Sequence, residues 1–244
     1  MSYKAFISYS HESDGEFADS LHDAMEKLAK PWTKRRARRV VLDKTAMSAG
    51  SSLSDTIEEK LADSEWLVLL ASPQSAQSTW VDDEIDYWAA NKSMDNVVVA
   101  LTGGEIVVDA RGQSVDWENS TALSDRFRAA VGDDAVPLYE DLRPFKTDID
   151  RVKLRNAHFR DEVAKIVGRI EGEDPGELAS EDKRQYAHSV RLRRAAEIGL
   201  VILTVAAVIL GIRAVLSERR AVANEQRAIE NEKIAEENAR QARI

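Results

Sequence analysis

Short apolar runs recur along the first half of the chain, and an amphipathic stretch follows most of them. The runs cover residues 3–9, 40–42, 66–71 and 97–101. Runs this short and this apolar are typical of strands that are buried on both faces of a sheet. Because strands alternate with helices, the pattern predicts an α/β fold in which helices cover both faces of a parallel sheet.

Further segments complete a flavodoxin-like sheet of five strands. A fifth strand is expected at 135–139, and Pro137 would place it at an edge of the sheet, where a missing backbone donor is tolerated. A polar excursion at 105–117 is expected to form a hairpin that turns at 110–113. Helices are expected from 17 to near 31, over 52–64, from 78 onward, over 121–131 and over 149–170.

The helix that begins near Ser78 carries an aromatic residue and an acid on one face. Ser78 or Thr79 is a suitable N-cap. Trp80 and Glu84 are four residues apart, so they lie on the same side of the helix. A large ring beside a carboxylate would suit an aromatic or cationic ligand. The alternative is a packed Trp80 beside a solvated Glu84.

Polar loops follow the first three strands, and they are expected to meet. In open parallel sheets a ligand binds outside the carboxyl ends of the strands. Those ends are followed here by residues 8–11, 43–50 and 72–84, and Glu84 lies in the last of these segments. The basic run at 34–39 is either a solvated loop or an attractor for an anion.

The composition excludes several kinds of chemistry. The 244 residues contain no cysteine, which excludes disulfides, thiolate catalysis and cysteine-ligated zinc. The four histidines lack the spacing of metal ligands, so no metal site is expected. The net charge of -9 argues against general nucleic-acid binding. Residues 1–10 do not resemble a secretory signal, and the sequence has neither a Walker-type phosphate loop nor a serine-hydrolase elbow.

The domain assigned to residues 1–171 is followed by three segments of different character. Residues 172–194 are predicted to be a linker. Residues 195–216 are apolar except near their ends and are long enough to cross a bilayer, although a core helix of a larger assembly is the alternative. Basic residues flank both ends, so charge predicts no orientation. Residues 217–244 repeat alanine and asparagine every seven positions, which predicts a helical or coiled-coil stalk, or else a lone charged helix.

Three motifs together resemble those of a Toll/interleukin receptor (TIR) domain over about residues 3–170. In chain order they are residues 6–10 with Asp14, the loop 43–50, and Trp80 with Glu84. The loop resembles the BB loop of that family, with Ala49 where a proline is common. Because Glu84 is present, the motifs resemble those of bacterial and plant members more than those of animal receptor adaptors.

The resemblance implies one of two functions. Catalytic TIR domains cleave the nicotinamide–ribose bond of NAD, which is their substrate and not a cofactor, whereas other TIR domains are assembly modules without chemistry. The nicotinamide leaves as a neutral base and needs no proton, so Glu84 alone can suffice where glycosidases need two carboxylates. Glu84 would stabilise the cationic ribosyl transition state or capture it covalently. We predict cleavage and keep assembly as the alternative.

The resemblance also assigns roles to neighbouring residues. The substrate-binding residues would be Phe6, Ser8, Tyr9, Asp43, Lys44 and Trp80, although Ser8 and Tyr9 also fit ordinary strand-end polarity. TIR–TIR association would use the BB-loop residues Thr45, Ala46, Met47, Ser48, Ala49 and Gly50. The TIR domain is expected in the cytoplasm, where NAD is found. The stalk resembles the segment that precedes repeat domains in larger bacterial TIR proteins, so a sensor domain is expected C-terminal to this chain.

Overall fold

The computed structural model describes residues 2–30, 37–42, 55–148 and 151–241. Two compact units are present, Met1–Tyr186 and Ala187–Ile244, and each is described by itself. The predicted functional residues of the described part all lie in the first of these units.

Five parallel strands form the centre of the N-terminal unit, in the order β2-β1-β3-β4-β5. The strands are β1 (Tyr3–Ser8), β2 (Val40–Leu42), β3 (Ser64–Ala71), β4 (Val97–Leu101) and β5 (Tyr139–Asp141). In register, Ile7 of β1 pairs with Leu42 on one side and with Val68 on the other. This order is that of a flavodoxin-like sheet, so the predicted fold class is confirmed.

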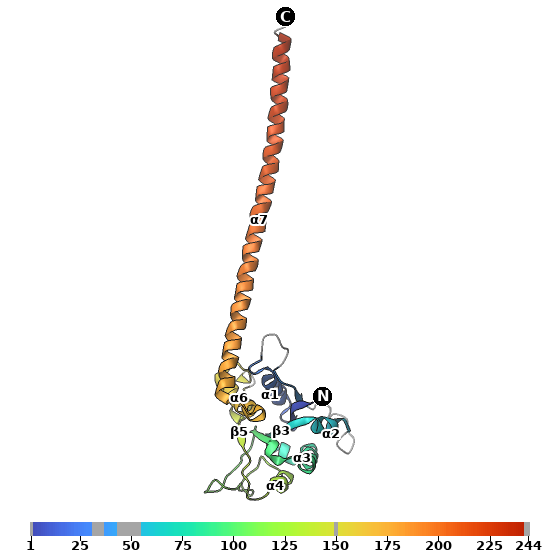
Figure 1. Cartoon of the computed structure of the whole chain (residues 1–244), viewed down its shortest axis with the longest axis vertical. Coiled ribbons are helices and arrows are strands. Elements are labelled where there is room, and N and C mark those ends of the chain that lie inside the picture. Colours follow the sequence, from blue (N-terminus) through green and yellow to red (C-terminus); the bar gives the residue numbers. More distant parts are fainter. Residues whose placement is uncertain (1, 31–36, 43–54, 149–150, 242–244) are drawn as a thin grey trace. The chain divides into compact units, whose positions relative to one another are not determined.

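Helices cover both faces of this sheet (Figure 1). They are α1 (Gly15–Lys27), α2 (Asp55–Ala62), α3 (Thr79–Asn91), α4 (Asp125–Val131), α5 (Arg143–Lys146) and α6 (Ala157–Glu171). The apolar sides of α1 and α6 pack on one face, and those of α2, α3 and α4 pack on the other. Successive residues of a strand point to opposite faces, which is why Phe6 and Ile7 belong to different cores.

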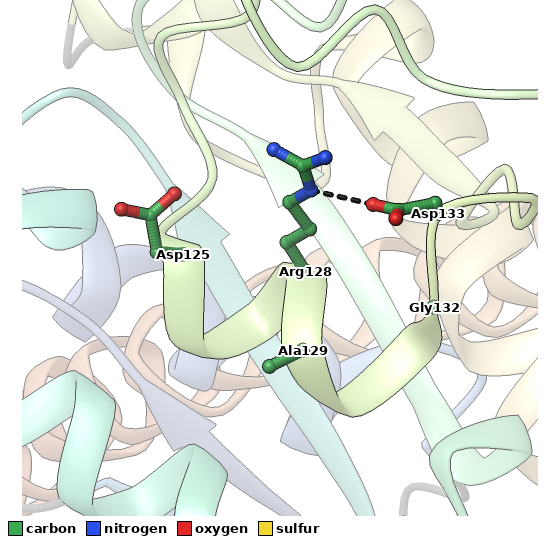
Figure 2. Close-up of a pocket in the computed structure, with 5 residues that line it drawn as sticks. All are labelled: Asp125, Arg128, Ala129, Gly132 and Asp133. Atoms are coloured by element: carbon green, nitrogen blue, oxygen red, sulfur yellow. Dashed lines mark hydrogen bonds and ion pairs between the residues drawn. The ribbon is translucent and has the colours of Figure 1, made fainter.

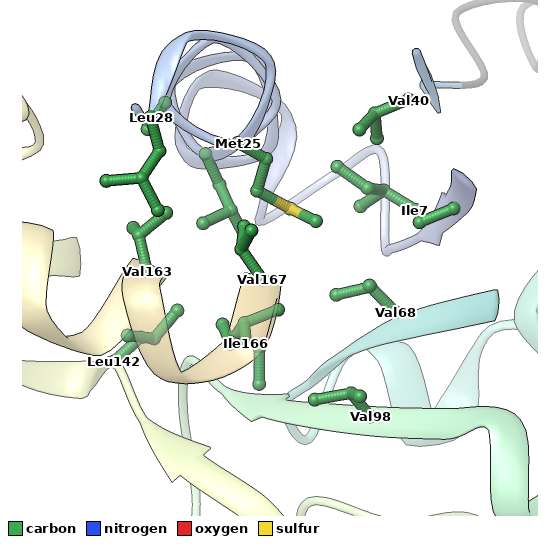
Figure 3. Packing of buried hydrophobic residues seen from close by; sticks show 14 of the residues in the cluster. Ile7, Met25, Leu28, Val40, Val68, Val98, Leu142, Val163, Ile166 and Val167 are labelled. Carbon is green, nitrogen blue, oxygen red and sulfur yellow. The ribbon is translucent and has the colours of Figure 1, made fainter. Parts of the chain in front are cut away.

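Aliphatic side chains from neighbouring strands and from α1 and α6 form the centre of the core under these two helices. Ile7, Val68 and Val98 extend from adjacent strands toward the helices (Figure 3). Opposite them lie Met25 and Leu28 from the α1 region and Val163, Ile166 and Val167 from α6. This burial of apolar surface is the main force that holds the two helices on the sheet.

Two helices begin later than the sequence predicts, because side-chain caps fix their starts. α4 begins at Asp125 and not at 121, since Ser124 Oγ accepts a hydrogen bond from Phe127 N at 3.2 Å. α6 begins at Ala157 and not near 149, since Asn156 Oδ1 accepts from Phe159 N at 3.3 Å. Serine and asparagine are strong N-caps, and each outweighs the apolar periodicity that extends upstream.

The fifth strand begins later than predicted, whereas the hairpin turns where the sequence predicts it. The strand was expected at 135–139, but β5 begins only at Tyr139, after Pro137, where the backbone can donate to β4. The polar excursion makes one antiparallel bridge, Val108 to Val115, and turns through Gly112, whose φ is +70°. Glycine tolerates this left-handed conformation without steric cost.

The segment after α6 is a compact joint and not the linker predicted at 172–194. α6 ends at Gly172 in a left-handed conformation, and α7 (Pro175–Gln241) begins at once. Leu178 and Ala179, in the first turns of α7, are buried in the core under α1 and α6. Asp182 Oδ1 accepts a hydrogen bond from Ala29 N at 3.2 Å, and burial raises the pKa of this carboxyl above its ordinary value. The N-terminal unit therefore continues past residue 171, to Tyr186.

The second unit consists of the rest of α7. Within the described part of the chain, one helical segment, Arg194–Gly211, is long and apolar enough to cross a membrane, with a mean hydropathy of 2.0. Its large apolar side chains, such as Leu200, Leu203 and Leu210, are exposed. This finding rests on length and composition alone. The coiled coil expected over 217–244 stays a prediction.

A matched pair of leucines tests how far the core under α1 and α6 stabilises the N-terminal unit. Leu142 is 0% exposed and Leu138 is 59% exposed. We expect Leu142→Ala to lower the free energy of unfolding by about 2–5 kcal/mol, because it leaves a cavity. Leu138→Ala should change it by no more than about 0.5 kcal/mol. Urea unfolding followed by tryptophan fluorescence measures both, since all five tryptophans lie in the N-terminal unit. Equal losses would contradict the packing described here.

Candidate functional site

A turn made by two serines connects β3 to the helix that carries Trp80 and Glu84. Ser72 N donates to Ser75 Oγ at 2.8 Å, and Ser75 N donates to Ser72 Oγ at 3.1 Å. A short 3₁₀ turn, η1 (Ser75–Gln77), follows, and Ser78 is the N-cap of α3, as predicted. The exchange of hydrogen bonds between the two serines satisfies backbone groups that the end of the strand leaves unpaired.

Glu84 lies on the inner side of α3. It is 4% exposed and shares this side of the helix with Val81, Ile85 and Trp88. The alternative of a solvated Glu84 is therefore wrong. A buried carboxylate is unusual on the apolar side of a helix, because desolvation disfavours its charged form. Trp80 is half-buried and packs against the core on the same face of the sheet.

Two strand exits enclose a pocket of about 390 Å³, which we call the rim pocket. One wall is the segment that follows β1, and the other is the segment that leads into α3. The described residues that line it are Ser10, His11, Glu12, Gln74, Gln77, Ser78, Thr79 and Trp80. The rings of Tyr9 and His11 lie beside this wall with their centroids 4.4 Å apart. The pocket is at the carboxyl ends of the strands, where the sequence predicts a ligand.

The predicted substrate-binding residues do not all reach the rim pocket. Among the described residues, Trp80 lines it, whereas Phe6, Ser8 and Tyr9 are buried and are not part of its lining. Phe6 packs in the core under α2 and α3, and Tyr9 packs in the core on the opposite face. Ser8 Oγ is buried and has no hydrogen-bond partner in the described part of the chain. Glu84 is also absent from the described lining.

The remaining predicted residues lie outside the described part of the chain. These residues are Asp43 and Lys44 of the substrate set and Thr45, Ala46, Met47, Ser48, Ala49 and Gly50 of the BB loop. Their assigned roles stay predictions.

Sequence reasoning missed most of the side chains that line the rim pocket. His11 and Glu12 follow β1 directly, and Gln74 and Gln77 lie between β3 and α3. The sequence could have pointed to these residues only through their positions, because the loops at 8–11 and 72–84 were expected to lie close together. Within the described residues, no group of three His, Asp or Glu side chains is arranged to hold a metal ion.

A second hollow, also of about 390 Å³, lies on α4 (Figure 2). Its lining comes from α4 and the two residues after it, including Asp125, Arg128 and Asp133. Arg128 Nε donates to Asp133 Oδ1 at 2.6 Å, and both side chains are largely exposed. An exposed pair on one short helix offers no opposing wall, so this hollow is a weaker candidate than the rim pocket.

Comparisons with known proteins give a family for part of the chain and one informative relative. Residues 6–105 match the family described as "Thoeris protein ThsB, TIR-like domain". A protein named "NAD(+) hydrolase ApTIR", from an Actinoplanes species, is 37% identical over 196 residues, which cover 80% of this chain and 27% of that protein. This chain thus spans about a quarter of the length of that curated relative.

One solved structure is also similar in part. It holds the TIR domains of the activated Roq1 resistosome, which directly recognises the pathogen effector XopQ. The sequence identity is 14% and the TM-score is 0.32, with 76% of this chain and 99% of that chain covered. The fold is therefore assigned from the strand order of the sheet and not from this similarity. The family match covers residues 6–105, which include part of β1 and all of β2, β3 and β4, so the N-terminal unit is similar to a TIR-like domain over four of its five strands.

Proposed function

We propose that the N-terminal unit is an NAD+ glycohydrolase, which cleaves the nicotinamide–ribose bond and releases nicotinamide with linear or cyclic ADP-ribose. The observation that carries this proposal is the relationship to a protein named an NAD(+) hydrolase, at 37% identity over 196 residues. The matched length is 80% of this chain.

Glu84 is the residue that we propose for the chemistry. As nicotinamide departs it becomes neutral, and the positive charge that it loses develops on the ribose. A carboxylate that faces this charge lowers the energy of the transition state, and it needs no partner acid. The burial of Glu84 favours this role, because an ion interacts more strongly with an opposite charge where water is excluded.

The rim pocket is the place that we propose for the substrate. Trp80 lines this pocket and offers an aromatic surface to a flat ring. Ser8, at the end of β1, lies outside the described lining, and its hydroxyl has no hydrogen-bond partner among the described residues, so a ligand or an ordered water could bind to it. Because Glu84 is not in the described lining, we propose that self-association of TIR domains completes the route from the pocket to this carboxylate.

An assembly module without chemistry is the second candidate. The observation that favours it is the one just given, namely that Glu84 is buried and separate from the described lining of the rim pocket. In that case Glu84 would serve only the packing of α3. Release of nicotinamide separates the two candidates.

Glu84→Gln tests the catalytic assignment, with Asp83→Asn as the matched control. Asp83 directly precedes Glu84 in α3 and is exposed. Its amide variant therefore removes one negative charge, as Glu84→Gln does, but leaves the proposed site unchanged. We expect Glu84→Gln to lower kcat by about 10²-fold or more, and Asp83→Asn to stay close to the wild type. The measurement is chromatographic detection of nicotinamide released by the full chain, clustered on liposomes.

Two results would contradict this assignment in different ways. If the clustered wild type releases no nicotinamide at high concentration, the enzymatic function is lost. If Glu84→Gln keeps the wild-type rate, the function stands and Glu84 is not its catalytic residue. Thermal unfolding of each variant shows whether a lost rate follows from a lost fold.

We further propose that residues 195–216 cross a membrane once and hold the TIR-like domain on the cytoplasmic side, where NAD is available. The apolar segment Arg194–Gly211 and its exposed leucines support this, because apolar side chains on all sides of a helix suit contact with lipid. A role in defence or signalling, with clustering at the membrane as the trigger, belongs to the same proposal.

Paired charges in the apolar segment test the membrane span. We expect Leu203→Lys with Val205→Asp to raise the cost of insertion by roughly 3 kcal/mol for each charge. Carbonate washing should then extract this variant from membranes and leave the wild type in the pellet. The control places the same two charges at Asn224 and Gln226, which lie outside the apolar segment. Extraction of the wild type itself would overturn the proposal.

A further inference from the structure

A buried carboxylate lies behind the rim pocket and collects hydrogen bonds from distant parts of the chain. Asp14 is 0% exposed. Its Oδ1 accepts from Thr102 Oγ1 at 2.8 Å and from Lys146 Nζ at 2.7 Å. Its Oδ2 accepts from Ser72 Oγ at 3.0 Å and from Ser13 Oγ at 2.6 Å. We call these five residues the Asp14 cluster.

The members of the Asp14 cluster come from the exits of four strands. Asp14 follows β1, Ser72 follows β3 directly, Thr102 follows β4 directly, and Lys146 ends the short helix after β5. One carboxylate therefore connects four segments that lie far apart in the sequence.

The position of Asp14 in the chain shows that this arrangement is not ordinary helix capping. Asp14 is the N-cap of α1, where an aspartate normally accepts a hydrogen bond from the first turn of its own helix. Its side chain makes no such bond. Both carboxylate oxygens are instead directed to the other exits, and α1 begins without that support.

Both walls of the rim pocket are attached to Asp14, one through its backbone amide and the other through its carboxylate. On one side, Asp14 N donates to Ser10 O at 2.8 Å, which holds the turn that carries His11 and Glu12. On the other side, Ser72 binds the carboxylate and exchanges hydrogen bonds with Ser75 at the start of the opposite wall. A shift of Asp14 would move the two walls together.

We propose that Asp14 and Lys146 form a positioning pair, which fixes the two walls of the rim pocket in the geometry that binds substrate. Lys146 supplies a positive charge against the buried carboxylate, and without it Asp14 would keep only hydroxyl donors. A buried charge that loses its counter-ion is destabilised, and a movement of the carboxylate toward water would release Ser72 and Thr102. The kinetic consequence rests on the proposed function, whereas the effect on the walls does not.

The expected kinetic result is a change in substrate affinity and not in the chemical step. Because neither member of the pair lines the described part of the pocket, their loss should weaken binding and leave the bond cleavage at Glu84 largely intact. We expect Lys146→Met to raise KM by about 10-fold or more and to change kcat by less than about 3-fold. Lys146→Arg keeps the positive charge and should restore most of the affinity.

The test combines hydrogen exchange with kinetics on the full chain in detergent. We expect amide exchange in segments 10–14 and 72–80 to become about 10-fold faster in Lys146→Met, because both walls open more often. Lys27→Met is the matched control, since Lys27 pairs with Asp23 on the exposed side of α1. Thr102→Val removes one donor at nearly constant shape and gives a milder variant if Lys146→Met does not fold.

Each outcome decides the proposal. Faster exchange at both walls, together with the KM effect and its rescue by Lys146→Arg, supports it. Unchanged exchange at either wall in a folded Lys146→Met or Thr102→Val variant overturns it. Faster exchange with an unchanged KM overturns the role in substrate binding. If the wild type releases no nicotinamide, the proposed function fails, and the exchange result alone still decides whether the pair positions the walls.

Discussion

A parallel sheet that is covered by helices on both faces can place polar groups only where its strands end. The inner strands β1, β3 and β4 are almost wholly buried, so their side chains can contribute packing but little chemistry. The strand exits bring hydroxyl and ammonium donors to the same rim, and these donors need a buried acceptor. The carboxylate of Asp14 is that acceptor. In the proposal made above, these hydrogen bonds fix the positions of the exits that form the rim pocket.

The two acids of this region illustrate different ways to keep a carboxylate in a protein interior. Asp14 is surrounded by donors from four segments, which compensate the loss of water. Glu84 is 4% exposed and shares the inner side of α3 with Val81, Ile85 and Trp88. In the function that we propose, this buried carboxylate faces the positive charge that develops on the ribose.

The strands of the sheet could be predicted from the sequence, but the contacts within the candidate site could not. Apolar runs located β1 to β4 because a doubly buried strand has a local signature, whereas α6 was misplaced because the cap at Asn156 competes with a longer periodicity. Helical spacing placed Trp80 and Glu84 on one face but could not say that this face is buried. The partners of Asp14 lie 58, 88 and 132 residues away in sequence, and no local pattern contains pairs of that separation. The predicted topology placed the ends of the strands at one rim of the sheet. It could not predict which side-chain atoms form hydrogen bonds there.

The joint between α6 and α7 determines where this domain can be separated from the remainder of the chain. A cut at Gly172 would follow the change in composition, yet it would remove Leu178 and Ala179 and leave a dry gap beneath α1. Gly168 has no room for a side chain, because an added Cβ would lie 2.7 Å from Glu173 O. A substitution at Gly168 would therefore disturb the packing of the joint. An excised form that is meant to behave as the native domain must keep the helix at least to Tyr186, and a shorter fragment would report on a damaged core.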